Sequence, residues 1–300
     1  MGSGSDNLDY STFAFDHRIT RSIFLSGLVI LIYDHLLTLR TEIKYIWSSK
    51  LRLSTCWFFT VRYLGLGLTL VMFSYYFGAS DHEEEWAWQI FIVSLEVLVE
   101  VTLALRVIAM YGFNRMILLG FLAATCTVVG ISLWGLIEYG EHPDLIEEPG
   151  LSGCHPAFSG AAALRPATIW EIILLFDCVV FVLTVRRAYQ RHSLPLYSGS
   201  LVQRMVTDGS MYFGIIVLSN LANVLSLYLG DLLLGGLMSW FTTNMSLALI
   251  CRLMLNLHEA GAHGVASEAP EATLDLHSIR FAMPRSEGAD VEYSMDEIVE

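Results

Sequence analysis

Long apolar runs separated by short polar stretches dominate the chain from residue 22 to residue 257. A helix needs about 20 apolar residues to cross the ~30 Å hydrocarbon core of a bilayer. Several runs reach that length, with boundaries that are soft by a few residues. The pattern predicts an all-α fold, a seven-transmembrane-helix bundle. The expected helices are 22–39, 55–77, 86–111, 116–137, 167–185, 210–229 and 233–255.

The polar connections between these segments alternate in charge. Residues 40–54 contain four basic side chains and the single acid Glu42, whereas residues 78–85 contain four acids and no Lys or Arg. The long connection 138–165 is again acidic, and four arginines lie in 186–204. Because Lys and Arg in short loops mark the cytoplasmic side, we expect the N-terminus outside and the C-terminus in the cytoplasm. The plasma membrane is the expected location.

Composition supports a membrane protein. Of 300 residues, 54% are hydrophobic and 16% charged, and the mean hydropathy of +0.54 is high for a water-soluble domain. The bilayer is therefore the expected partner, and a net charge of −13 argues against nucleic acid binding. We expect an outer N-terminal segment 1–20, a transmembrane domain 21–257 and a disordered, acidic cytoplasmic tail 258–300.

Charged residues inside the apolar segments are the first candidates for function, because each costs at least about 2.5–3.5 kcal/mol in the bilayer unless it is compensated. Asp34, Arg62 and Arg106 all fall in the inner third of their helices when depth is counted along the segments. We hypothesise an ion pair of Asp34 with Arg62, Arg106 or both. Alternatively, either arginine extends to the lipid phosphates.

A second, acidic layer is predicted near the middle of the membrane. Glu96 and Glu100 are one helical turn apart and share a face, and Asp177 lies at a similar depth. Asn220 and Asn223 extend this polar layer. No Lys or Arg is expected at that level, so the carboxyl groups must hold protons, share them or bind a cation. Buried neutral carboxyls that only connect helices remain the structural alternative.

Several classes of active site are excluded by the residues present. The only lysines, Lys44 and Lys50, lie in a loop, so no lysine is available for a retinal Schiff base. Only His35 among the histidines falls within a predicted helix, which argues against a zinc site or a Ser-His-Asp site. We expect no catalytic residue, no metal and no cofactor, and not an enzyme.

One stretch resembles a known family. Its residues are Tyr33-Asp34-His35, Leu36 to Leu39, Glu42-Ile43, Ile46-Trp47 and Arg62-Tyr63-Leu64. This motif, spanning about residues 22–67, is similar to the opening domain of basidiomycete multi-pass membrane proteins catalogued as domain of unknown function 6533. Later segments, such as Asp208-Gly209, also resemble that family, although Thr207 stands where an arginine is expected. The resemblance implies the multi-pass fold and no particular activity.

Three functions remain open. The first is a receptor- or sensor-like seven-helix bundle with a small-molecule ligand and with cytoplasmic partners at the inner loops and tail. The second is a proton- or cation-coupled transporter or channel that uses the mid-membrane carboxyls. The third is a scaffold without a ligand. We favour the receptor-like function, although the chain lacks Asp-Arg-Tyr at the third helix and Asn-Pro-x-x-Tyr in the seventh.

Overall fold

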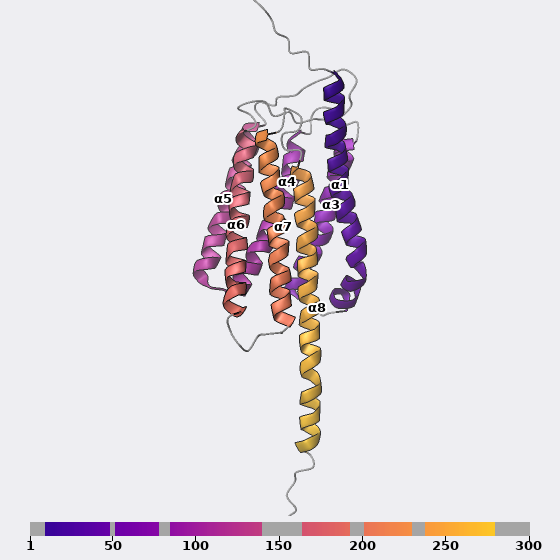
Figure 1. Ribbon diagram of the computed structural model, residues 1–300, viewed down its shortest axis with the longest axis vertical. Coiled ribbons are helices and arrows are strands. Elements are labelled where there is room, and N and C mark those ends of the chain that lie inside the picture. Colours follow the sequence, from indigo (N-terminus) through magenta and orange to yellow (C-terminus); the bar gives the residue numbers. More distant parts are fainter. Residues whose placement is uncertain are drawn as a thin grey trace, which may run out of the picture. The chain divides into compact units, whose positions relative to one another are not determined.

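The computed structural model describes residues 10–48, 52–77, 85–139, 164–192, 201–229 and 238–279. Within these ranges all regular secondary structure is helical, which confirms the expected all-α class. The helices coincide with the apolar segments and mostly extend beyond them (Figure 1). In chain order they are α1 (Tyr10–Glu42), η1 (Ile43–Trp47), α2 (Leu53–Phe59), η2 (Thr60–Leu64), α3 (Gly65–Phe77), α4 (Glu85–Met110), α5 (Arg115–Tyr139), α6 (Leu164–His192), α7 (Leu201–Leu229) and α8 (Ser239–Ile279).

Two of the long helices contain a π-helical turn. The π-helix η1 continues α1, and η2 joins α2 to α3 without a break. A π-helix forms i→i+5 hydrogen bonds and changes which side chains share a face, and it often occurs at functional sites. The sequence pattern gave no indication of either turn, because periodicity arguments assume 3.6 residues per turn.

Among the described residues, five helices are long and apolar enough to cross a bilayer, which indicates an integral membrane protein. The two other long helices, α4 and α8, are more polar. Beyond its first residue, Glu85, α4 carries the charged residues Glu96, Glu100 and Arg106, and the start of α8 is rich in Ser, Thr and Asn. The five spans are Arg18–Trp47, Leu53–Phe77, Arg115–Trp134, Ala167–Gln190 and Gly209–Leu229.

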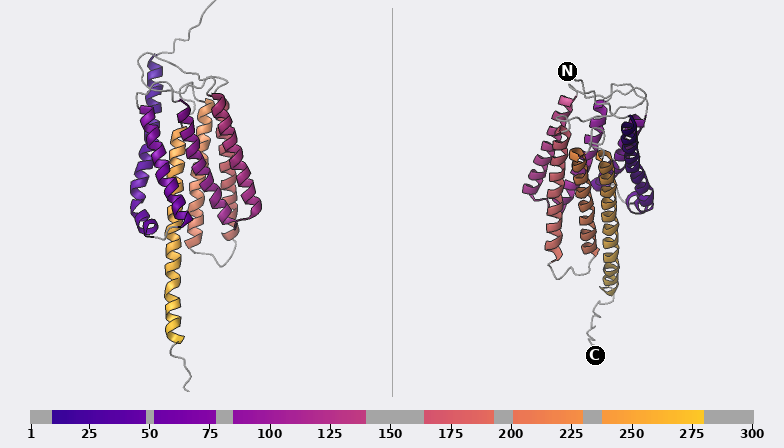
Figure 2. Two further views of the ribbon diagram at one scale, coloured as in Figure 1. Left: turned by 180° about the vertical axis from the view of Figure 1, so that it is seen from behind. Right: turned by 45° about the horizontal axis from the view of Figure 1, so that its top comes forward.

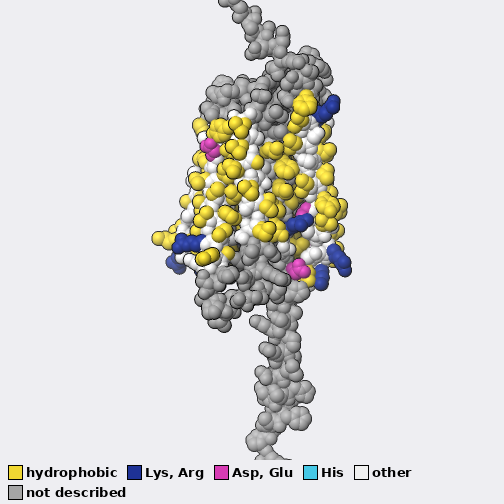
Figure 3. Space-filling view, in the orientation of Figure 1, with side chains coloured by type: hydrophobic (Ala, Val, Ile, Leu, Met, Phe, Trp, Pro, Cys, Tyr) yellow, Lys and Arg dark blue, Asp and Glu magenta, His cyan; other side chains and the backbone are white. Residues whose placement is uncertain are grey.

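The distribution of side chains between surface and interior is the reverse of that in a water-soluble protein. Large apolar side chains such as Leu36, Leu119 and Leu218 are exposed, whereas Glu96, Arg62 and other polar residues are buried. In the space-filling view the described surface is mostly hydrophobic, with Lys and Arg mainly in its lower part (Figure 3). Such a continuous apolar surface is expected where lipid is the solvent.

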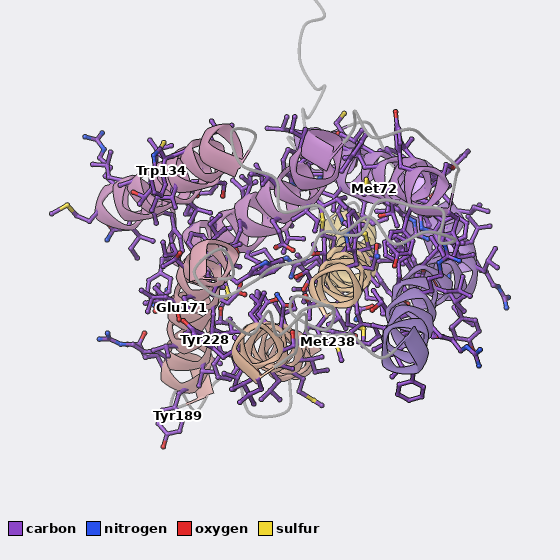
Figure 4. All side chains as sticks on the ribbon, turned by 90° about the horizontal axis from the view of Figure 1, so that it is seen from above. Met72, Trp134, Glu171, Tyr189, Tyr228 and Met238 are labelled. Atoms are coloured by element: carbon purple, nitrogen blue, oxygen red, sulfur yellow. The ribbon has the colours of Figure 1, made fainter. Side chains whose placement is uncertain are left out.

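The first part of α8 packs against several other helices. Seen from above, it lies in the middle of the bundle (Figure 4), and it runs alongside α7 in both views of Figure 2. Two glycines permit close approach: a Cβ at Gly27 of α1 would lie 3.2 Å from the Cα of Phe241, and one at Gly65 would lie 2.7 Å from Leu247 Cδ2. Small residues at such crossings are typical of membrane helices.

The ends of α4, α5 and α6 are joined by specific polar contacts. Gly112 has a left-handed φ of 67°, which ends α4, and Asn114 Oδ1 accepts a hydrogen bond from the backbone N–H of Met116 at the start of α5. Arg187 Nε of α6 donates to the carbonyl of Met110 at 3.1 Å and so caps the C-terminus of α4. The Tyr111 hydroxyl donates to the carbonyl of Leu183 at 3.0 Å.

The chain divides into two compact units, Met1–Ala260 and Gly261–Glu300. The first contains the helical bundle. In the second, α8 remains helical to Ile279, so the first part of the expected tail 258–300 lies in this helix. Residues 280–300, and residues 1–9 of the expected N-terminal segment, lie outside the described residues.

Candidate functional site

We define the acidic triad as Glu96, Glu100 and Asp177. Glu96 and Glu100 lie on the same face of α4, and Asp177 comes from α6, which packs against α4. Their exposed fractions are 4%, 3% and 2%. Each carboxyl is within electrostatic range of another member of the triad, because Glu100 interacts with both Glu96 and Asp177. The mid-membrane acids expected from the sequence are therefore buried and close together.

Neutral polar side chains from α7 and α8 complete this site. Asn220 Nδ2 donates to Asp177 Oδ2 at 2.5 Å, and Thr243 Oγ1 lies 2.5 Å from Glu96 Oε1. Ser239 donates to Asn223 Oδ1 at 3.0 Å. Asn220 and Asn223, both expected from the sequence, are thus placed in this layer.

Sequence reasoning missed the α8 members Ser239 and Thr243. The signal was present, because Ser239, Thr243 and Ser246 recur at the spacing of one helical face. Charged residues and asparagines are the stronger signal within an apolar segment. The hydroxyls of Ser and Thr cost less to bury and are common in membrane helices, so they stood out less.

Glu100 differs from its neighbours in having no hydrogen-bond partner. Both of its carboxyl oxygens are buried and unpaired within the described part of the chain. Asp177 Oδ1 and Asn220 Oδ1 are likewise unpaired. Among the described residues, no group of three or more His, Cys, Asp or Glu side chains has the geometry to hold a metal ion.

We define the inner cluster as Asp34, Glu42, Arg62 and Arg252. Glu42 lies at its centre and is fully buried: Arg62 Nε lies 2.8 Å from its Oε2. Trp47 Nε1 donates to Glu42 Oε1 at 2.9 Å, and the Tyr63 hydroxyl donates to the same oxygen at 2.8 Å. Both π-helical turns take part, since Trp47 ends η1 and Arg62 and Tyr63 lie in η2.

Arg62 connects this carboxylate to α1. Its Nη2 donates to the carbonyl of His35 and to Thr38 Oγ1, both at 2.9 Å. The rings of His35 and Tyr63 meet edge to face with centroids 5.4 Å apart. The guanidinium is thus held by an acid and by α1 backbone rather than extending to the lipid phosphates, which was the alternative considered from the sequence.

The expected partner of Asp34 requires a correction. Asp34 forms its ion pair with Arg252 of α8, while Arg62 pairs with Glu42 and acts on Asp34 only at longer range. Arg106 forms no ion pair with a described acid, and its buried Nη2 has no hydrogen-bond partner among the described residues. Helix α1 extends beyond residue 39, so Glu42 belongs to it and pairs with Arg62. Asp34 is then available to pair with Arg252 of α8.

A model of a protein family described as "Family of unknown function (DUF6533)" matches residues 22–67. This range covers most of α1, η1, α2 and η2, and it contains every member of the inner cluster except Arg252. The matched segment is therefore the part of the chain in which Glu42 and Arg62 pair. No curated protein and no solved structure was found to match the chain.

Proposed function

We propose that the chain is a receptor- or sensor-like membrane protein with seven transmembrane helices, an outer N-terminus and a cytoplasmic C-terminus. In this proposal α4 and α8 cross the membrane together with the five apolar spans. Helix α4 has 26 residues, which at about 1.5 Å per residue gives ~39 Å, enough for the hydrocarbon core. Its charged groups Glu96 and Glu100 are turned to the interior, so they do not oppose insertion.

The observation that carries the proposal is the way α8 is held. Polar side chains of α8 pair with four other helices: Thr243 with Glu96 of α4, Asn244 with Thr69 of α3, Arg252 with Asp34 of α1, and Asn256 with Tyr212 of α7. Such contacts run from the acidic triad to the inner cluster along one helix. A helix held by hydrogen bonds and ion pairs can shift by exchanging these partners for others. Such a shift of α8 would transmit a conformational change from the acidic triad to the inner cluster.

The orientation in this proposal follows from the basic residues. Four basic residues are exposed: Arg40 at the end of α1, Lys44 in η1, Arg52 just before α2 and Arg186 near the end of α6. They belong to connections that the positive-inside rule assigns to the cytoplasm. Cytoplasmic partners would then meet the inner loops and the segment after α8, and the plasma membrane is the proposed location. A small molecule is the proposed kind of ligand.

A proton-coupled transporter is the second candidate, and the acidic triad is the observation that favours it. Buried carboxyls without a basic partner are typical of proton pathways. Flux measurements separate the two functions. The purified protein is reconstituted in liposomes, a pH gradient is imposed, and internal pH is followed with a trapped fluorescent dye.

We expect wild type to dissipate the gradient no faster than empty liposomes do. Proton flux in wild type that is lost in Glu96→Gln and in Glu100→Gln would replace the receptor-like proposal with the transporter. Glu171→Gln is the matched control, because Glu171 is an exposed acid of α6 that bonds to Tyr228 and lies away from α8 (Figure 4). It makes the same Glu-to-Gln change outside the triad.

A further inference from the structure

The acidic triad contains more carboxyl groups than its surroundings can neutralise. The charged groups that act on Glu100 are Glu96 and Asp177, and both are acids. Arg106, six residues further along α4, has no described acid acting on it. Since neighbouring carboxylates in a low dielectric cannot all be ionised, the site must retain protons.

The groups that face the triad from the other helices are neutral. Asn220 on α7 contacts Asp177 and Thr243 on α8 contacts Glu96, while Asn223 and Ser239 bond to each other beside Thr243, whose hydroxyl also reaches the Ser239 carbonyl. Cys178, next to Asp177, is half-buried and also brings no positive charge. Protonation is therefore the available means of reducing the charge in this layer.

The contacts of Thr243 indicate where one proton lies. Its Oγ1 is 2.5 Å from Glu96 Oε1 and 2.8 Å from the backbone carbonyl of Ser239. A hydroxyl has one hydrogen, and a carbonyl can only accept. When Thr243 donates to Ser239, the hydrogen in its contact with Glu96 must come from the carboxyl group. This geometry favours a Glu96 that keeps a proton and donates it to Thr243.

Asp177 and Glu100 differ in their ability to carry charge. The amide of Asn220 donates to Asp177, and such a donor stabilises a carboxylate. Glu100 has no donor at either oxygen and lies between two other acids. An ionised Glu100 would therefore be both unsolvated and repelled.

We propose that the triad is a proton-binding site in which Glu96 holds a fixed proton, Glu100 holds the exchangeable proton and Asp177 carries the negative charge. The inference rests on the proposed function only for the position of α4 within the membrane, and it holds for a sensor or a transporter. Release of the proton from Glu100 places a second negative charge beside Asp177. Repulsion then acts between α4 and α6, so a rise in pH loosens their packing.

Infrared spectroscopy of the whole protein in lipid nanodiscs tests the assignment, because a protonated carboxyl has its own C=O stretching band. We expect a part of this band to disappear as pH rises in wild type, and to be missing at all pH values in Glu100→Gln. In Asp177→Asn the transition should remain but its midpoint should move to lower pH, by about one pH unit or a tenfold change in proton affinity, because the negative charge that repels an ionised Glu100 is gone.

Glu171→Gln, the control, should keep the wild-type transition. Because Gln imitates the protonated acid, Glu100→Gln should fold, and Asp177→Asn gives a second, independent reading.

Two results would overturn the proposal. One is a pH-dependent band that persists unchanged in Glu100→Gln. The other is a pH midpoint in wild type that shifts with the concentration of Na⁺ or K⁺ but not with that of choline. If this shift is absent in Glu100→Gln, the triad is a metal cation site. Proton flux through the wild type would overturn the receptor-like function and leave this assignment intact, because the spectra are taken without a gradient.

Discussion

At the scale of single residues, Glu42 is the largest difference between sequence and structure. In the sequence it is the single acid in a basic loop, next to Arg40 and Lys44. In the structure it is fully buried and bonded to Arg62, Trp47 and Tyr63. Helix α1 reaches Glu42 and continues as a π-helix, so the residue belongs to the bundle and not to a loop.

Replacing Glu42 tests whether this ion pair supports the fold. We expect Glu42→Gln to lower the free energy of unfolding by about 3–5 kcal/mol, because it leaves the guanidinium of Arg62 buried without a counter-charge. Thermal unfolding in detergent measures the change. Arg40→Gln is the control, since Arg40 is exposed and should change stability by less than about 0.5 kcal/mol.

A double substitution separates the ion pair from side-chain size. Glu42→Leu with Arg62→Leu removes both charges, and we expect it to be more stable than Glu42→Gln alone. A Glu42→Gln protein with the Tm of wild type would show that Arg62 needs no acid there.

The candidate residues of the triad were predictable, whereas their partners were not. Glu96, Glu100 and Asp177 stood out because a carboxyl within an apolar run is costly and has few explanations. Partner choice depends on how helices rotate and cross, which one sequence does not determine. Asp34 shows this: Arg62, Arg106 and Arg252 all lie near the inner end of a segment, and only the packing of α8 against α1 selects Arg252.

At the scale of helices, the apolar segments predicted the positions of the helices well and their first and last residues less well. The predicted 55–77 and 116–137 differ by about two residues from Leu53–Phe77 and from α5. Helix α1 begins at Tyr10 instead of residue 22, and α8 continues to Ile279. Hydropathy marks where a helix meets lipid, but a helix can continue into water where its residues favour helix.

The approach of α8 to α3 gives a test at this scale. Gly65→Ala places a Cβ only 2.7 Å from Leu247 Cδ2. We expect overpacking to lower the free energy of unfolding by about 1–3 kcal/mol. Gly67→Ala is the matched control in the same helix, because nothing lies within 4 Å of its Cβ position. It should be neutral or stabilise by up to about 1 kcal/mol.

The cause can be assigned to Leu247 by a double-mutant cycle. In a Leu247→Ala background the Cβ at position 65 meets open space, so Gly65→Ala should cost clearly less than it does in wild type. Equal costs in both backgrounds, measured by thermal unfolding, would mean that α3 and α8 do not meet at this glycine.

At the scale of the whole molecule, a lipid environment accounts for apolar side chains on the surface and polar side chains in the interior. Five apolar spans are enough to indicate a membrane protein, and the more polar α4 and α8 pack inside with their charges turned away from lipid. This explains why only five of the described helices are apolar enough by themselves to span a membrane, although the sequence contains seven apolar segments. The interior helices carry the polar side chains that the lipid-facing ones cannot.

Membrane orientation is tested by labelling single cysteines in a variant without the five native ones. Phe15 and Ser48 are exposed and lie at opposite ends of the rod formed by α1 and η1. Their separation of 33 positions along the helix corresponds to about 50 Å, more than the hydrocarbon core. With an impermeant maleimide, Phe15→Cys should react in intact cells and Ser48→Cys only after permeabilisation.

A tag at the C-terminus tests the number of crossings in the same cells. Seven crossings place the two ends of the chain on opposite sides, so the tag should be detected only after permeabilisation while Phe15→Cys reacts without it. Detection of both in intact cells would require an even number of crossings, and then either α4 or α8 would not span. Labelling of Ser48→Cys in intact cells would instead reverse the orientation, because the basic residues around it would face outward.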